Sequence, residues 1–185
     1  MLRTLKLVFL ACATMATMAS HAHAQTAPSV RDFSFLIGEW RGDAAFLRPF
    51  QPDAGPLRET VEAECRYILR ETYVQCHTRW TRPDTGRIRE VVMLWNFNEQ
   101  SGQLEALFLA SNYGAESGYA VHWDERERAF VGLTSTQTPD GAPAQERSLY
   151  IPGADGATFE GREFVMPANA AEWVQTFRFH WRRVQ

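Results

Sequence analysis

Few side chains in this sequence of 185 residues are spaced so that they could carry out chemistry together. His77, His122 and His180 stand far apart along the chain and have no metal-ligand spacing. Glu62 and Glu64 could form a pair of acid–base carboxylates, but they alternate with apolar residues, a pattern typical of the solvated face of a strand. We therefore assign no catalytic residue and predict no metal site.

Lysine-dependent chemistry finds no support, because Lys6 is the only lysine in the chain. A Schiff-base enzyme or a P-loop nucleotide-binding protein needs a lysine in its folded domain. The sequence also has neither a Gly-x-Ser-x-Gly nucleophile elbow nor a Gly-x-Gly-x-x-Gly dinucleotide motif. These common enzyme classes are therefore not supported by the residues present.

Cys65 and Cys76 are the residues best placed to form a covalent link. Residues 59–69 and 72–81 both alternate between apolar and polar side chains, as two strands of a hairpin do. A two-residue turn at Arg70-Glu71 would place Cys65 opposite Cys76, within disulfide range, although neither turn residue favours positive φ. We predict a disulfide worth about 3 kcal/mol in the loop-closure picture. Two buried thiols or a redox pair remain alternatives, but there is no Cys-x-x-Cys motif.

The first residues read as an export signal. Two basic residues precede an apolar run over 7–18, which is too short to span a membrane, and Ala22-His23-Ala24 matches a signal-peptidase site. We predict a signal peptide at 1–24 and a mature domain at 25–185 that is periplasmic or secreted. A lipoprotein anchored at Cys12 and a buried helix are the alternatives.

The charge of the chain argues against nucleic acids and anionic membranes as partners. The formal net charge is −3, and the predicted cleavage removes Arg3 and Lys6 but no acid, which leaves −5. After residue 24 no apolar run approaches the roughly 20 residues of a spanning helix, so we predict no transmembrane span. The mature length fits one domain.

Turn residues recur every eight to fifteen positions after residue 50, and the segments between them are short and rich in aromatic and β-branched residues. This spacing is typical of antiparallel hairpins. We predict an all-β fold, a single antiparallel meander barrel of about ten strands. Their expected ranges are 40–48, 59–69, 72–82, 87–97, 104–111, 118–124, 128–136, 145–151, 157–165 and 172–183. A short helical turn over 28–36, capped by Ser29 or Ser34, is expected before the first strand.

The segment Gly38-Glu39-Trp40-Arg41-Gly42 resembles the lipocalin, or calycin, signature at the start of the first strand. It is closer still to exported bacterial lipocalin-like barrels of unknown function, of the type called domain of unknown function 1579. The later segment Leu94-Trp95-Asn96-Phe97-Asn98 also resembles that group. The resemblance covers most of the mature chain and implies a lipocalin-like barrel.

The resemblance also implies a structural floor made of Gly38, Trp40, Gly42 and Arg182. In lipocalins the tryptophan closes one end of the barrel and buries a large ring there. An arginine of the last strand often stacks on it through a cation–π contact. Arg182 and Arg183 both qualify, but they have opposite strand parity.

Haem-binding barrels that resemble nitrobindin also begin with Gly-x-Trp-x-Gly. They usually have a third glycine two residues later, where this chain has Ala44. Their haem needs a histidine, and His180 lies between Phe179 and Trp181 but on the opposite strand face from them. We therefore expect no cofactor, with haem as the alternative.

A barrel of this size either packs solid or holds one small ligand. The leading hypothesis is that the domain binds a small apolar or amphipathic molecule in its interior. The expected wall residues are Tyr67, Val74, Trp80, Trp95 and Phe108. The alternatives are an envelope structural or interaction protein without a ligand, and an enzyme with an acid–base group in the cavity. The sequence does not predict an oligomeric state.

Overall fold

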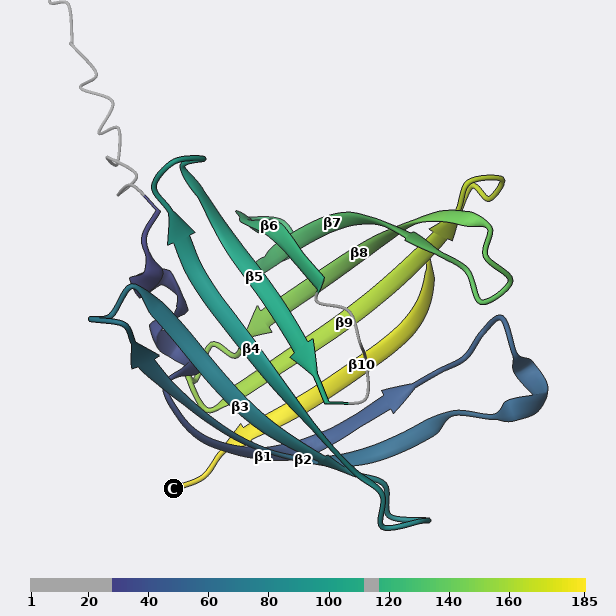
Figure 1. The fold of residues 1–185 in the computed structure, drawn as a ribbon, viewed down its shortest axis with the longest axis horizontal. Helices are drawn as coiled ribbons and strands as arrows, with labels where there is room; N and C mark the ends of the chain where they lie inside the picture. Colours follow the sequence, from purple (N-terminus) through teal and green to yellow (C-terminus); the bar gives the residue numbers. More distant parts are fainter. Residues whose placement is uncertain (1–27, 112–116) are drawn as a thin grey trace, which may run out of the picture.

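The computed structural model describes residues 28–111 and 117–185, and it confirms the predicted all-β fold. In these ranges, each strand pairs antiparallel with the next, and the last pairs with the first, so that the sheet closes into a barrel (Figure 1). The strands are β1 (Gly38–Phe46), β2 (Leu57–Ile68), β3 (Tyr73–Thr81), β4 (Ile88–Asn98), β5 (Gln103–Ala110), β6 (Ser117–Asp124), β7 (Ala129–Gln137), β8 (Pro143–Pro152), β9 (Thr158–Pro167) and β10 (Val174–Arg183). Because the sheet closes, each strand among the described residues has a paired neighbour on both sides, although the β6–β7 ladder is short.

The β2–β3 hairpin has the predicted register. Cys65 faces Cys76 and the two form the predicted disulfide inside the barrel, where both are buried. The turn is longer than a two-residue turn, because the last pair in the ladder is Ile68 with Tyr73. Arg70 and Glu71 both have positive φ, which neither residue type favours.

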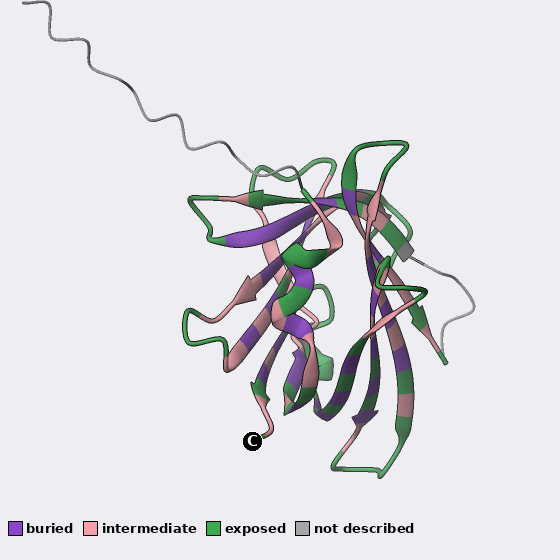
Figure 2. Cartoon of the chain, turned by 90° about the vertical axis from the view of Figure 1, so that its left-hand side faces the viewer, coloured by how far each residue is buried: buried purple, intermediate pink, exposed green. Residues whose placement is uncertain are grey.

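A short 3₁₀ helix, η1 (Val30–Leu36), covers one end of the barrel, which we call the closed end (Figure 2). Its start is fixed by a capping box, in which the Ser29 side chain accepts from Arg31 N and the Asp32 carboxylate accepts from Ser29 N. Phe33 and Leu36 point into the barrel and are fully buried. The predicted helical turn is therefore present and seals this end.

Trp40 lies directly beneath η1. Its ring is 1% exposed, and its indole N–H donates to Leu36 O at 2.7 Å. The Arg183 guanidinium lies 4.3 Å from the ring centroid and donates to the backbone oxygens of Phe35, at 2.7 Å, and Ile37. Arg183, paired with Trp40 across the β1–β10 seam, therefore occupies the position for which Arg182 was predicted. Arg182 has the opposite parity and is exposed on the outer face.

The two glycines of the Gly-x-Trp-x-Gly segment make room for this seam. Gly38 has a φ of 125°, and a Cβ there would lie 2.6 Å from the Arg183 guanidinium. A Cβ on Gly42 would lie 1.9 Å from the backbone oxygen of His180, on the neighbouring strand. A larger residue at Gly42 would push β10 away from β1, and one at Gly38 would be strained at this φ and would displace the Arg183 guanidinium.

Aromatic side chains fill the interior at the closed end. Trp80, Trp95, Trp181 and Phe159 are fully buried and contact one another or Phe33 and Phe179 at ring separations of 4.8–6.5 Å. We call this group the aromatic core. It supplies the main apolar burial of the domain. No helix in the described ranges is long and apolar enough to cross a membrane.

Candidate functional site

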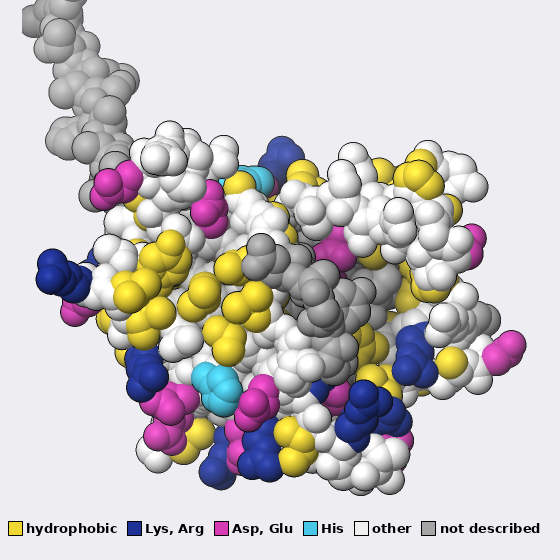
Figure 3. All heavy atoms as spheres, viewed as in Figure 1, with side chains coloured by type: hydrophobic (Ala, Val, Ile, Leu, Met, Phe, Trp, Pro, Cys, Tyr) yellow, Lys and Arg dark blue, Asp and Glu magenta, His cyan; other side chains and the backbone are white. Residues whose placement is uncertain are grey.

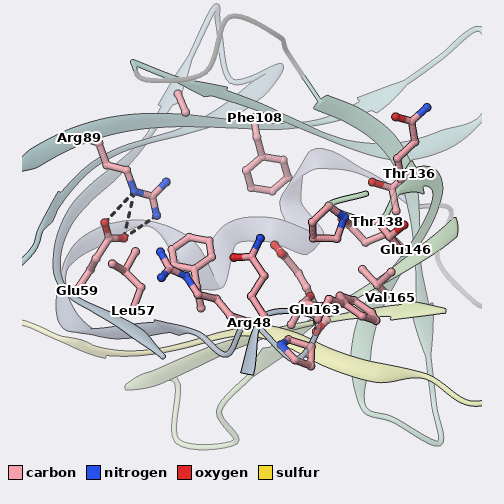
Figure 4. Close-up of a pocket in the computed structure, with 18 of the residues that line it drawn as sticks. Arg48, Leu57, Glu59, Arg89, Phe108, Thr136, Thr138, Glu146, Glu163 and Val165 are labelled. Carbon is pink, nitrogen blue, oxygen red and sulfur yellow. Dashed lines mark hydrogen bonds and ion pairs between the residues drawn. The ribbon is translucent and has the colours of Figure 1, made fainter. Parts of the chain in front are cut away.

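A cavity of about 690 Å³ opens at the end of the barrel opposite η1. Its rim includes the loop between β1 and β2, which contains the short helix η2 (Pro52–Ala54), together with the β3–β4 turn and the start of the β7–β8 turn. Its depth is lined by inward side chains of the strands, as Figure 4 shows. Half of the barrel is therefore filled and half is hollow. The apolar part of the wall comes from Phe46, Phe50, Leu57, Phe108, Ala110 and Val165.

A buried ion pair lies between the aromatic core and the cavity. Glu59 of β2 is 4% exposed and accepts from Arg89 of β4 at 3.2, 3.1 and 2.7 Å. The Arg89 guanidinium is also held against the rings of Trp80, at 4.4 Å, and Phe46, at 5.1 Å. Glu59 and two aromatic rings of the protein itself thus contact this guanidinium.

Two further glutamates face the cavity from neighbouring strands. Glu163 of β9 pairs in the ladder with Ser148 of β8, and Glu146 is two residues from Ser148 on the same face. No arginine or histidine nitrogen lies within 4 Å of either carboxyl group in the described part of the chain. Both are therefore acids without a cationic partner.

Burial shifts the proton affinity of both acids. It raises the pKa of Glu163 to about 8, with a further rise from the charge of Glu146 and a smaller opposing effect of Arg89. Burial also raises the pKa of Glu146, and a hydrogen bond to Ser148 opposes that rise. At neutral pH Glu163 is therefore mostly a neutral carboxylic acid that can donate a hydrogen bond.

Three hydroxyl groups lie next to the two acids, in the direction of the aromatic core. Tyr119 donates to Ser148 Oγ at 3.2 Å, and its hydroxyl also hydrogen-bonds that of Tyr150. Burial raises the pKa of Tyr119 and of Tyr150, so both phenols stay neutral at physiological pH. These hydroxyl groups hydrogen-bond to one another and are not among the residues that line the cavity.

The raised pKa of Glu163 predicts how the free energy of unfolding depends on pH. The folded-state pKa of Glu163 lies above its unfolded value of about 4.3, so the unfolded chain binds fewer protons between the two values. The free energy of unfolding is then expected to fall as pH rises from about 5 to about 8, by at most about 1.4 kcal/mol per pH unit. Denaturant titrations across this range measure the slope. In Glu163→Gln the slope is expected to flatten, and an unchanged slope would contradict the prediction.

The five predicted wall residues occupy different parts of the barrel. Phe108 lines the cavity. Trp80 lies beneath it, and Trp95 and Val74 are buried in the filled half. Tyr67 is near the closed end, where its ring lies 4.8 Å from the Arg31 guanidinium. The structure therefore brings one of the five to the cavity.

The residues that sequence analysis missed are the charged ones: Glu59, Arg89, Glu146 and Glu163. The sequence could have indicated them, because each stands at the alternate positions of its strand that carry the inward residues. Glu59 has the parity of Cys65, and Glu163 has that of Val165. An acid in the apolar register of a strand is either a functional group or a partner of another buried charge.

All the histidines that the structure describes lie on the outer face. His77, His122 and His180 alternate with inward residues, and His180 lies 3.4 Å from Glu160 on that surface. The interior of the described barrel therefore offers no imidazole to an iron, and the residues do not fit a histidine-ligated haem. His21 and His23 belong to the predicted signal, which lies outside the described residues.

Comparison with known proteins supports the fold alone. No family model matches the sequence, and no curated protein matches it significantly. Among solved structures, the barrel is similar to the crystal structure of Rv2717c from M. tuberculosis, with a TM-score of 0.59 at 11% sequence identity. The match covers 84% of this chain and 97% of that one, so it extends over the whole barrel.

Proposed function

We propose that this protein is an exported barrel that binds one small amphipathic molecule in the cavity at its open end. The observation that carries the proposal is the half-hollow interior: a rigid aromatic core closes one end, and about 690 Å³ remains at the other. Ligand pockets have volumes of about 300–1,000 Å³ and a few placed polar groups in an apolar wall. The disulfide fits an oxidising compartment, which supports export.

The composition of the wall supports an amphipathic ligand over a purely apolar one. Phe46, Phe108 and Val165 supply apolar surface, which contributes about 25 cal/mol per Å² buried. Glu163 would be left without a partner beneath an alkane, which is costly in an apolar site. A polar end group on the ligand removes that cost.

Filling the cavity is expected to abolish binding. Ala110 lines the cavity at the end of β5, and Ala110→Trp places an indole in its space. We expect a loss of affinity of at least about tenfold for N-phenylnaphthylamine, a fluorescent apolar amine that serves as the probe, or for any molecule recovered by organic extraction and native mass spectrometry.

Leu109→Trp is the matched control, because Leu109 is the preceding residue and lies 39% exposed on the outer face. It adds the same ring to the same strand outside the barrel and is expected to leave binding unchanged. Circular dichroism and thermal unfolding show that both variants remain folded. Equal binding by wild type and Ala110→Trp would overturn the proposal.

The docking alternative predicts an exposed apolar patch beside a filled interior. An apolar strip is present on the outer face over β4 and β5, visible in Figure 3, and it consists of Val92, Leu94, Leu107 and Leu109. The interior, however, is not filled. The cavity therefore favours ligand binding over docking as the main role.

An enzymatic role is the second candidate, because Glu163 is an inward acid whose pKa of about 8 suits proton transfer. The extraction experiment also tests this role. A carrier returns a bound probe unchanged after incubation in deuterated water. An enzyme that moves protons at carbon returns it deuterated, and Glu163→Gln is expected to stop that exchange.

A further inference from the structure

We infer that the ligand carries a cationic end, such as a primary ammonium group, which binds between Glu163 and Glu146 while its apolar part lies against Phe108 and the mouth. The inference rests on the proposed function and adds the chemical class of the ligand. It is carried by two acids of the cavity wall that have no cationic partner within 4 Å among the described residues.

The positive charge inside the barrel is already neutralised. Arg89 is the inward arginine of β4, and its nitrogens make three contacts with Glu59, at 2.7–3.2 Å. It is also held between the rings of Trp80 and Phe46. Glu59 is therefore the acid that Arg89 pairs with, and no ion pair joins Arg89 to a second acid among the described residues.

The arginines of the mouth do not reach the acid pair either. Arg82 makes an ion pair with Asp84 at 2.6 Å, at the rim. Arg48 and Arg87 also line the opening, and neither has a nitrogen within 4 Å of Glu163 or Glu146. Figure 4 shows Arg89 and Glu59 on one side of the cavity and Glu146 on the other, with Glu163 between them.

The two acids are placed as a pair. Glu163 and Glu146 lie on adjacent strands, diagonal to each other across the β8–β9 ladder, on the same inward face. Diagonal neighbours in a sheet are about 7–8 Å apart at Cα, close enough for both carboxylates to contact one ammonium group. An ammonium group has three donors, so it can hydrogen-bond both carboxylates at once.

Binding of a cation is linked to release of a proton. The unliganded Glu163 is mostly neutral at pH 7, and a bound ammonium group stabilises its ionised form. Of the other groups at or near the cavity, Tyr119 and Tyr150 stay neutral because burial raises their pKa, and burial also raises the pKa of Glu146. The affinity for an ammonium ligand is therefore expected to rise with pH up to about 8, by at most about tenfold per pH unit.

The test compares three probes with the same alkyl chain and different ends: octylamine, octanol and octanoate. Isothermal titration calorimetry of the mature protein at about pH 6 and about pH 8 gives affinities, and buffers of different ionisation enthalpy give the protons released. We expect octylamine to bind more tightly than octanol by at least about tenfold at the higher pH, with release of protons at pH 7. Octanoate is expected to bind most weakly.

Two variants and one control locate the effect. Glu163→Gln and Glu146→Gln keep the size of the side chain and are expected to remove most of the preference for octylamine and, for Glu163→Gln, its pH dependence. Glu64→Gln is the matched control, because Glu64 is exposed on the outer face of β2. It is expected to bind all three probes as the wild type does.

The outcomes separate the two proposals. If none of the probes binds at either pH and N-phenylnaphthylamine does not bind, the proposed function fails. If octanol or octanoate binds as tightly as octylamine, or if affinity falls with rising pH, the cavity binds ligands but the inference of a cationic end is wrong. That inference is also wrong if Glu163→Gln and Glu146→Gln both keep the octylamine preference of the wild type.

Discussion

Trp40→Ala is expected to lower the free energy of unfolding by about 3–5 kcal/mol, a large part of the about 5–15 kcal/mol that a domain of this kind has. The indole is 1% exposed, so its removal leaves a cavity that the surrounding strands cannot collapse to fill. The substitution also removes the hydrogen bond to Leu36 O and the ring on which Arg183 rests. Urea denaturation followed by circular dichroism measures the loss.

Trp123→Ala is the matched control for this change. Trp123 is 38% exposed at the end of β6 and contacts one aromatic ring, that of Phe130, among the described residues. Its removal is expected to cost clearly less than the removal of Trp40. Equal losses in the two variants would show that Trp40 does not close the barrel in the way described above.

Glu59→Gln is expected to destabilise the protein by about 3 kcal/mol. The substitution leaves the Arg89 guanidinium, whose side chain is 17% exposed, without a counter-charge in a largely dry site. We place the cost at the lower end of the usual range because Arg89 borders the cavity, where water can reach it. Thermal and denaturant unfolding at neutral pH measure the effect.

A double-mutant cycle tests the reason for that loss. In Glu59→Gln with Arg89→Met no buried charge is left unpaired, so the double variant is expected to be more stable than the sum of the single losses predicts. Asp84→Asn removes one partner of the Arg82 pair at the rim and is the surface control, with a much smaller expected loss than Glu59→Gln. Additive losses at Glu59 and Arg89 would contradict a coupled buried pair.

Much of the architecture could be predicted from local patterns. Turn residues and period-two alternation placed all ten strands to within a few residues, and alternation together with a turn centred on Arg70-Glu71 brought Cys65 opposite Cys76. This works because in a barrel the inward and outward faces of a strand differ in polarity. The alternation of apolar and polar residues therefore shows which side chains of a strand point inward. The capped helical turn before β1 could also be predicted, because its capping residue Ser29 lies next to it in the sequence.

The candidate site was harder to predict because its position depends on depth along the barrel axis. Strand parity shows that Trp80 and Trp95 point inward, but it does not show which end of the barrel is filled. That depends on η1 and on the stagger of strands far apart in the sequence. The inward acids Glu146 and Glu163 were readable by parity, yet their role follows only once the cavity is known.

The seam between β1 and β10 has a consequence for how the chain is made. The hydrogen bond from Arg183 to Phe35 O joins residues 148 positions apart, and the guanidinium ties both ends of the sheet to η1. Until β10 has been synthesised and has paired, the sheet is open and has two unpaired edges. Such edges are the part of a sheet most prone to pair with other chains. Closure of this barrel thus depends on β10, and loss of that strand is a greater hazard to it than a longer change in a mouth loop.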